Sequence, residues 1–479
     1  MRYRPRTGFC GHTAPQGKPK GVGVIRICAA AVLLVLSGQV PAFAAPKEYE
    51  PPPLPANAQL PPRGTEGAPA PDVPYVSNGQ QCIGSSAKGK TVEDIPYGQL
   101  RLNLEQAHRF ATGKGVKVAV IDTGVVEHPL LKGRVAGGGD FVERSNGKVD
   151  CDGHGTEVAG VLASSEDASG FVGAAPEAEI LSIRHTSDRF EFKGTASEPA
   201  RPRAGNLSTL AKAIVHAARS GAEVINISVT NCVAPQEFSA NDQMLQAAIR
   251  FAVDKEDVVI VTAAGNLGPT GCPDQNDNPD PRDVKVVASP PLFADDVLSV
   301  ASIGENGTVS QFSVWGPWVS IAGPGEGIVT LDPGGPGLVN AGISPEAKEQ
   351  QPIVGTSFAS PYVAGVAALV RERFPALTAR QVMARLKATA QHPGNTDGRD
   401  HKVGHGMVNP VAALTAVIPA ERPGATPPRI TPIHTVVNPP AERNWRSLGF
   451  ALGGAGTGFA LLLFTLFVVH AVRRSRAQA

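Results

Sequence analysis

The chain has 479 residues, which is enough for one large domain with additional segments at either end. Its 44 basic and 43 acidic side chains leave a net charge of +1, so the composition excludes the strongly basic surface typical of a nucleic-acid partner. Aromatic residues make up only 5% of the chain, whereas 53 glycines and 43 prolines are present. Much of the proline lies outside the predicted core.

Residues 1–44 have the pattern of a secretory signal peptide. Six Lys and Arg side chains precede an apolar run from Ile27 to Leu36, and the small residues Ala42 and Ala44 flank Phe43 at a cleavage site. An uncleaved anchor is the alternative, but the apolar run is short for a membrane span. We therefore predict an exported protein from which this segment is removed.

Residues 45–99 are rich in proline and show no hydrophobic periodicity. Such a sequence favours extended or polyproline-II backbone over a folded module. We predict a proline-rich extension that wraps the following domain and is held there by Cys82.

Strand and helix patterns alternate through residues 100–417, the predicted catalytic domain. Runs rich in Val and Ile predict buried strands at VKVAVIDTG, EILSIRH, EVINISV, DVVIVTAAG and VLSVASIG. Helical patterns occupy TEVAGVLAS, LSTLAKAIVHAARSG, NDQMLQAAIRFAV and FASPYVAGVAALVRERF, and Thr378 with Gln381 forms a capping box for another helix. Pro361 is expected in a first turn, where N–H groups have no intrahelical partner.

This alternation predicts an α/β fold, with a doubly wound, mainly parallel sheet and helices on both faces. Polar residues at the carboxyl ends of the strands should form the site. Two polar or Gly/Pro-rich stretches, residues 186–206 and 332–352, are predicted to be loops.

Four cysteines remain after the signal peptide, which carries Cys10 and Cys28. They are Cys82, Cys151, Cys232 and Cys272. An even number in an exported chain predicts disulfides. Cys232 and Cys272 each follow a predicted strand; if these strands are parallel neighbours, both cysteines lie at the same edge of the sheet, and we pair them. Cys82 is then left for Cys151, which would tie the extension beside His154.

The C-terminal region carries a predicted stalk, a membrane helix and a tail. Residues 418–447 are proline-rich, and residues 448–472 form an apolar run long enough to span a bilayer. Basic residues follow at once in residues 473–479. By the positive-inside rule this tail is cytoplasmic and the catalytic domain is extracytoplasmic, so the chain should be a single-pass protein of the cell membrane.

Four motifs place chemically suited residues at the ends of predicted elements. VAVIDTG contains Asp122, DGHGTEVAG contains His154, and GTSFASPYVAG contains Ser357. A serine hydroxyl becomes an effective nucleophile when an imidazole takes its proton and a carboxylate orients the imidazole. VTAAGN ends at Asn266, whose amide can stabilise the oxyanion of a tetrahedral intermediate. Each residue alone has a structural interpretation, as a turn cap, a core histidine or a helix cap, but four such motifs in this order favour catalysis.

The order Asp, His, Ser resembles the subtilase family of serine proteases, and the resemblance covers about residues 100–415, ending in HKVGHGMVNPVAAL. It implies that Asn266 and the backbone N–H of Ser357 form the oxyanion hole. It also implies that two short segments form the walls of the S1 substrate pocket. The S1 residues are Ser228, Val229, Thr230, Ala263, Ala264 and Gly265. Many subtilases carry a folded inhibitory prodomain, for which residues 45–99 show no pattern.

The whole arrangement resembles the mycosins, membrane-anchored subtilases of actinobacterial type VII (ESX) secretion systems. The resemblance implies a serine endopeptidase that cleaves selected secreted proteins and supports the membrane secretion complex. Two alternatives remain open: a structural subunit whose proteolysis is dispensable, and an anchored housekeeping or leader-peptide protease.

Signals for metals are weak. The segment DQNDNPDPRD (274–283) collects carboxylates and amides, but it lacks the glycine and final glutamate of a calcium loop. His401 and His405 have helical metal spacing, but Gly404 and Gly406 argue against a helix. We therefore predict no metal site and no cofactor, with structural calcium as the open alternative.

Overall fold

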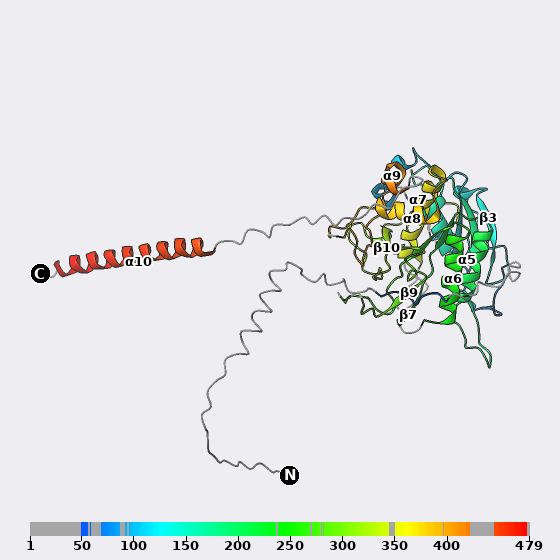
Figure 1. Cartoon of the computed structure of the whole chain (residues 1–479), viewed down its shortest axis with the longest axis horizontal. Coiled ribbons are helices and arrows are strands. Elements are labelled where there is room, and N and C mark those ends of the chain that lie inside the picture. The colour runs from blue at the N-terminus through cyan, green and yellow to red at the C-terminus, as the bar shows by residue number, and fades with distance from the viewer. Residues whose placement is uncertain are drawn as a thin grey trace, which may run out of the picture. The chain divides into compact units, whose positions relative to one another are not determined.

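The computed structural model describes residues 49–421, except 56–57, 59–68, 87–91, 93–94, 236–237, 269–270, 279, 281, 344–349 and 396, together with the helix at 445–476 (Figure 1). The chain divides into two units, residues 1–421 and 422–479. The predicted signal peptide, residues 1–44, and most of the predicted stalk lie outside the described residues.

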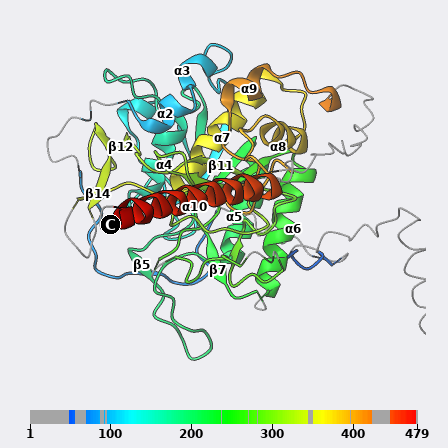
Figure 2. The same ribbon diagram turned by 90° about the vertical axis from the view of Figure 1, so that its left-hand side faces the viewer.

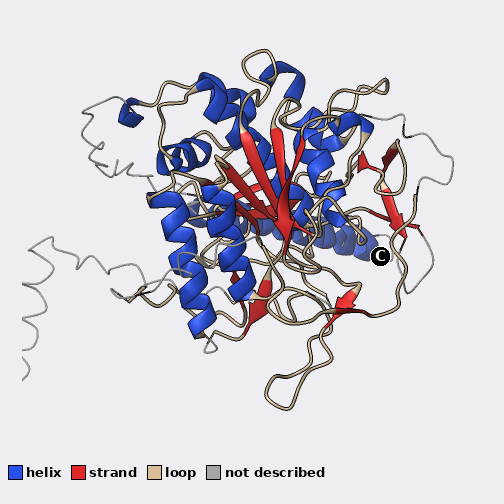
Figure 3. Cartoon of the chain, turned by 90° about the vertical axis from the view of Figure 1, so that its right-hand side faces the viewer, coloured by secondary structure: helices blue, strands red, loops and turns tan. Residues whose placement is uncertain are grey.

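A seven-stranded parallel sheet forms the centre of the first unit (Figure 3). Five strands coincide with the runs rich in Val and Ile. They are β2 (Lys117–Asp122), β4 (Glu179–Arg184), β6 (Val224–Ile227), β8 (Val259–Ala263) and β10 (Leu298–Ile303). These strands are buried almost throughout, because helices cover both faces of the sheet. The predicted α/β fold with a mainly parallel sheet is confirmed.

Two strands of the sheet do not appear in the sequence pattern. They are β3 (Val135–Asp140) and β11 (Ile321–Pro324), which give the order β11-β10-β8-β6-β2-β4-β3. Their sequences, VAGGGD and IAGP, are rich in glycine or end in proline, both of which have low strand propensity. Packing decides instead: a Cβ on Gly138 would lie 2.7 Å from the side chain of Ile183 in the neighbouring strand.

Helices cover both faces of the sheet. On one face α4 (His154–Ala163) packs with α7 (Thr356–Arg373); on the other α5 (Leu207–Arg219) packs with α6 (Ala240–Asp254). α8 (Ala379–Ala388) follows α7 and contacts both α6 and β8.

Capping boxes begin three of these helices. Asn206 caps α5, Ser239 caps α6 and Thr378 caps α8, and in each case the third helical residue returns a side-chain bond to the cap N–H. The box of Thr378 with Gln381 was predicted from sequence and is confirmed.

Pro361 is not in the first turn of its helix, so that prediction is wrong. α7 begins at Thr356, two residues before the predicted start, and Pro361 lies inside the helix. A residue with an N–H at this position would donate to the carbonyl of Ser357. Instead, that carbonyl accepts a bond of 3.0 Å from the Ser228 hydroxyl, so the missing helical bond is replaced from outside.

The described part of the extension contacts the rest of the first unit at several points. Its strand β1 (Val76–Ser77) pairs antiparallel with β5 (Phe190–Glu191), which lies in the predicted loop 186–206. The ring of Tyr49 meets that of Trp318 edge to face, and its hydroxyl donates to the Pro235 carbonyl. The described part of the extension therefore makes contacts with the rest of the unit, and it contributes a strand that the sequence does not indicate.

The remaining elements are short (Figure 2). The predicted loop 332–352 contains three short strands: β13 pairs with β12, which lies just before the loop, and β14 pairs with β15. The short elements are α2 (Tyr97–Arg101), α3 (Leu104–Ala107), η1 (Pro129–Leu131), β7 (Asn231–Val233), β9 (Val287–Ser289), β12 (Thr330–Leu331), β13 (Leu338–Val339), β14 (Ala341–Ile343), β15 (Gln350–Pro352), α9 (Pro410–Thr415) and η2 (Pro419–Glu421).

The described residues of the second unit form the helix α10 (Trp445–Arg476). Its segment Ala455–Arg474 is long and apolar enough to cross a membrane. The helix exceeds the predicted span of 448–472 at both ends, and Arg473, Arg474 and Arg476 lie in its last turn.

Candidate active site

The candidate site lies where the chain connections diverge from the middle of the sheet. Asp122 is the last residue of β2, which pairs with β4 on one side and β6 on the other. His154 is the first residue of α4, and Ser357 is the second residue of α7. Sites in open parallel sheets form at such switch points, outside the carboxyl ends of the strands.

Asp122 and His154 are in direct contact. His154 Nδ1 lies 2.7 Å from Asp122 Oδ1, which also accepts a 2.7 Å bond from the N–H of Thr123. Asp122 is fully buried, whereas 31% of the His154 side chain is exposed. A carboxylate accepts only, so Nδ1 carries the proton and Nε2 of the neutral ring carries the lone pair. This is the tautomer that a general base requires.

Ser357 follows next in the site, and its hydroxyl is bonded to Ser228 and not to His154. Its Oγ donates a 3.1 Å bond to the Ser228 carbonyl, and the Ser228 hydroxyl donates to the Ser357 carbonyl. The ring of Phe358, the next residue, lies 5.4 Å from the His154 ring. Within the described part of the chain no hydrogen bond joins Ser357 Oγ to His154. To transfer its proton to Nε2, Ser357 Oγ must leave the Ser228 carbonyl, and staggered χ1 rotamers offer it other directions.

Asn266 is held against the residue that precedes Ser357. Its Oδ1 accepts bonds of 2.9 Å from both the N–H and the hydroxyl of Thr356. The donor end, Nδ2, lies 3.4 Å from where a Cβ on Gly355 would stand, and Gly355 has φ +152°, which only glycine adopts readily. Ser357 lies in the first turn of α7, where N–H groups have no intrahelical acceptor. The Ser357 backbone N lies 3.6 Å from the same point, so two N–H donors border one small space.

The residues predicted to line S1 come from the two segments that flank Ser357. Ser228 exchanges hydrogen bonds with Ser357, and Gly265 donates its N–H to the Thr356 hydroxyl at 3.3 Å. Ala263, the last residue of β8, and Ala264 are buried, and Val229 packs against the main core. Thr230 follows Val229 in the segment that leads to β7.

The structure joins Cys82 to Cys151 and Cys232 to Cys272, the pairing inferred from the sequence. The premise of that inference holds, because β6 and β8 are parallel neighbours. The N–H of Cys272 donates a 2.8 Å bond to the carbonyl of Asn266, so the second bridge lies beside the candidate oxyanion donor.

Among the described residues no group of three or more His, Cys, Asp or Glu side chains could hold a metal ion. In the 274–283 segment the side-chain amides of Gln275 and Asn276 form hydrogen bonds with backbone groups. Gln275 bonds to Ser313 and Trp315, and Asn276 bonds to Val286. The amide oxygens accept bonds from backbone N–H groups: Gln275 Oε1 from Trp315, and Asn276 Oδ1 from Lys285 and Val286.

Acidic groups surround His154 and bear on its protonation. Burial lowers the pKa of His154, but the charge and hydrogen bond of Asp122, with the charges of Glu157 and Asp150, raise it from 6.5 to about 9. Burial raises the pKa of Glu157 to about 8. The charge of His154 lowers this pKa, whereas the charges of Asp150 and Asp122 raise it further. Glu157 belongs to none of the predicted site residues, although it stands three residues after His154 on the same helix.

Because His154 must be neutral to take a proton, activity should rise with pH along an acid limb above pH 6.5. Replacing Glu157 by Gln removes a negative charge that favours the imidazolium, so the limb should move to lower pH. Since Glu157 and His154 titrate in the same range, the apparent pKa belongs to the pair.

The measurement is kcat/KM against pH for the wild type, Glu157→Gln and the exposed control Glu105→Gln. An acid limb at the same pH in all three proteins would show that Glu157 does not change the pKa of His154.

The fold and this arrangement of residues define a subtilisin-like serine endopeptidase, and the profile of the Subtilase family matches residues 113–406. The chain is 40% identical over 452 residues to mycosin-1 of Mycolicibacterium smegmatis, covering 91% of this chain and 96% of that protein. The chain belongs to the mycosins, within the subtilase family.

Solved structures agree. A structure described as a serine protease MycP1, an essential component of the type VII (ESX-1) secretion system, matches with a TM-score of 0.70 and 42% identity, covering 77% of this chain and 100% of that one. A chain from an intact ESX-5 inner membrane complex matches with a TM-score of 0.70 and 37% identity, covering 88% of this chain and 100% of that one.

Proposed function

We propose that Ser357 is the nucleophile, His154 the general base and Asp122 the residue that orients and stabilises the imidazole. The observation that carries this proposal is the 2.7 Å contact of His154 with a fully buried carboxylate, beside the first turn of the helix that bears Ser357. Asn266 Nδ2 and the Ser357 N–H are the proposed oxyanion donors.

The reaction is acyl transfer to the serine and then to water. Ser357 Oγ attacks the scissile carbonyl while His154 Nε2 takes its proton. The carbonyl oxygen becomes an anion, which Asn266 and the Ser357 N–H stabilise more strongly than the ground state. His154 then protonates the leaving amine, and a water activated by the same nitrogen releases the acyl group from Ser357. All of these groups come from the chain, so we propose that the reaction uses no cofactor.

We propose that the protease is anchored beside a type VII secretion complex, with its catalytic domain outside the cell membrane and its C-terminus in the cytoplasm. The match to a chain of an ESX-5 inner membrane complex supports the association. The arginines at the end of α10 support the orientation. The proposed segments are a signal peptide (1–44), an extension (45–99), a catalytic domain (100–417), a stalk (418–447), a membrane helix (448–472) and a tail (473–479).

The test is affinity purification of the full-length chain, wild type and Ser357→Ala, from its own cells in mild detergent. Both proteins should recover the same membrane secretion complex, and a serine-directed organophosphonate should label only the wild type. Failure to label Ser357 would contradict the catalytic assignment. Recovery without any secretion components would contradict the proposed partner and favour an anchored housekeeping protease.

The proposed S1 walls predict the residue accepted on the acyl side of the cleaved bond. Val229, Ala263 and Ala264 are apolar, and none of the six wall residues carries a charge. A buried ammonium without a partner costs several kcal/mol, so substrates with small or medium apolar P1 residues should exceed those with Lys by ~10²-fold or more in kcat/KM.

Matched peptides that differ only at P1, with Ala, Val, Leu, Lys or Arg, provide the measurement. A preference for Lys or Arg would show that these residues do not line the pocket, or that an acid elsewhere reaches it.

A further inference from the structure

Asp150 is a buried carboxylate four residues before His154, and the proposed mechanism does not use it. Its Oδ1 accepts bonds from the Thr123 hydroxyl at 2.8 Å and the Gly153 N–H at 2.7 Å. Its Oδ2 accepts bonds from the Thr156 N–H at 2.9 Å and the Thr156 hydroxyl at 2.6 Å. All four partners are donors, which is the environment that an acceptor-only group requires.

The hydroxyls of Thr123 and Thr156 each accept a further hydrogen bond from the backbone. The Thr123 hydroxyl accepts a 2.8 Å bond from the N–H of Gly155, and the Thr156 hydroxyl accepts a 3.1 Å bond from the N–H of Val126. Each carboxylate oxygen of Asp150 therefore binds one hydroxyl and one N–H, and each hydroxyl binds one further N–H. We call Asp150, Thr123 and Thr156 the Asp150 clamp.

The Asp150 clamp accepts hydrogen bonds from the backbone on both sides of His154. Gly153 and Gly155 are the residues before and after His154. The N–H of Gly153 donates to Asp150, and the N–H of Gly155 donates to Thr123. Thr123 directly follows Asp122, and its own N–H donates to Asp122 Oδ1. The backbone that carries the base and the backbone that carries its orienting carboxylate are thus tied together through one buried group.

We propose that Asp150, acting through Thr123 and Thr156, is a positioning residue that holds His154 against Asp122 and thereby sets kcat. The proposal rests on the catalytic role proposed for His154. Catalytic groups must stay within about 0.5 Å of their productive geometry, and groups behind them provide that precision. A misplacement of about 1 Å at a catalytic group can cost ~10²-fold in rate.

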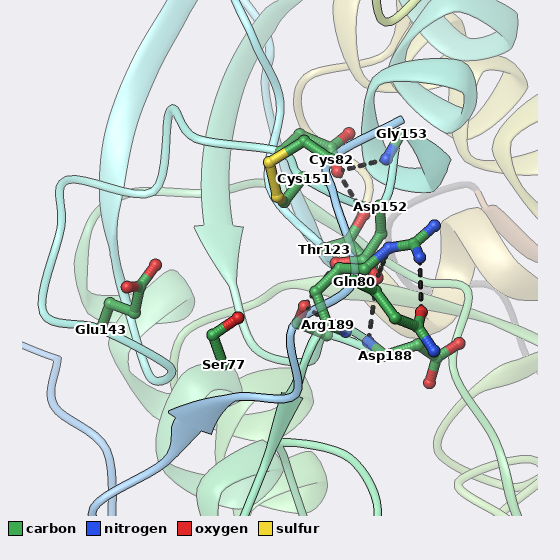
Figure 4. The surroundings of a disulfide bond; sticks show 12 residues. Ser77, Gln80, Cys82, Thr123, Glu143, Cys151, Asp152, Gly153, Asp188 and Arg189 are labelled. Atoms are coloured by element: carbon green, nitrogen blue, oxygen red, sulfur yellow. Dashed lines mark hydrogen bonds and ion pairs between the residues drawn. A yellow bond between two sulfur atoms is a disulfide. The ribbon is translucent and has the colours of Figure 1, made fainter. Parts of the chain in front are cut away.

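The neighbours of Asp150 face other parts of the chain. Cys151 is bonded to Cys82 of the extension, and Asp152 accepts bonds from the Ser187 hydroxyl and the Asp188 N–H (Figure 4). Arg189, which lies 3.8 Å from Asp152, also donates to Gln80 of the extension. Asp152 therefore provides a matched control, because Asp152→Asn makes the same chemical change two residues away without reaching β2.

Two kinds of substitution separate the effect of a lost hydrogen bond in the clamp from the effect of the lost Asp150 charge. In Asp150→Asn the amide NH₂ must face one of the two N–H groups, of Gly153 or Thr156, so at least one arm of the clamp breaks. The same change removes a negative charge that raises the pKa of His154. Thr123→Val breaks one arm and removes no charge, whereas Thr123→Ser keeps the hydroxyl.

The experiment measures kcat, KM and the pH profile of the full-length chain in detergent, with a peptide substrate, for the wild type and these four variants. Asp150→Asn and Thr123→Val should lower kcat by up to ~10²-fold with KM little changed. Thr123→Ser and Asp152→Asn should stay near the wild type. Asp150→Asn should also move the acid limb to lower pH, whereas Thr123→Val should leave it in place.

A spectroscopic signature accompanies the rates. In a Ser357→Ala background, the proton NMR signal of His154 Nδ1–H should broaden in Asp150→Asn and in Thr123→Val and stay sharp in Asp152→Asn. A clamp that only stabilises the fold would leave this hydrogen bond unchanged in protein that remains folded.

Wild-type kcat in folded Asp150→Asn and Thr123→Val would overturn the proposal, as would equal losses in Thr123→Ser and Thr123→Val. If Asp150→Asn does not fold, the comparison of Val with Ser at position 123 decides alone. Wild-type protein that neither hydrolyses peptides nor labels at Ser357 would instead contradict the proposed function, and with it this inference.

Discussion

Ser357→Ala is expected to lower kcat by roughly 10⁶-fold, the loss that follows removal of the nucleophile from a triad of this order in subtilisin. The structure gives no reason for the variant to unfold. In the resting state Ser357 Oγ makes one hydrogen bond, to the Ser228 carbonyl, and losing one such bond costs about 1 kcal/mol. The variant should therefore remain folded, with a melting temperature within a few degrees of the wild type.

Ser360→Ala is the matched control. Ser360 lies three residues further along the same helix, is fully buried, and also contacts Ser228, at 3.1 Å between hydroxyl oxygens. The same chemical change there should leave turnover within a few-fold of the wild type. A double variant of Ser357→Ala with His154→Ala should be no slower than either single variant, because the groups act as one unit. Turnover at wild-type rate in Ser357→Ala would refute the assignment.

Long apolar runs made the centre of the sheet predictable, whereas its edges were not. The strand that ends at Asp122 is buried along nearly its whole length, so its sequence alone carries the signal. β3 and β11 are strands because a neighbour supplies the ladder, despite their glycines and proline. The same holds for β1, whose two residues become a strand only by pairing with β5 far along the chain.

The site shows a similar division. The four motif residues were predictable because each motif requires small residues beside one reactive group. The resting direction of the Ser357 hydroxyl depends on Ser228, which is 129 positions away in sequence, and no local pattern encodes that contact. The bond of Asp150 to Thr123 likewise joins residues 27 positions apart. Such long-range polar contacts appear only once the chain is folded.

Asp122→Asn is expected to lower kcat by about 10⁴-fold, the loss seen when the same change is made in another serine-protease triad. Asp122 Oδ1 accepts two bonds, from the Thr123 N–H and from His154 Nδ1, while Oδ2 is buried without a partner among the described residues. An asparagine has two ways to fill this space. With its oxygen in place of Oδ1, its NH₂ is buried without an acceptor, and the negative charge that stabilises the imidazolium is gone.

In the other orientation the NH₂ faces the Thr123 N–H, and His154 Nδ1 must accept a hydrogen bond rather than donate one. The imidazole proton then sits on Nε2, where the ring cannot take the proton of Ser357. Each orientation leaves a buried donor unpaired, at ~1–3 kcal/mol, so a lower melting temperature should accompany the loss of activity. Asp188→Asn is the control, because that side chain is 76% exposed and should change neither quantity. If Asp122→Asn kept more than a tenth of wild-type kcat, Asp122 would not be the residue that sets the tautomer of His154.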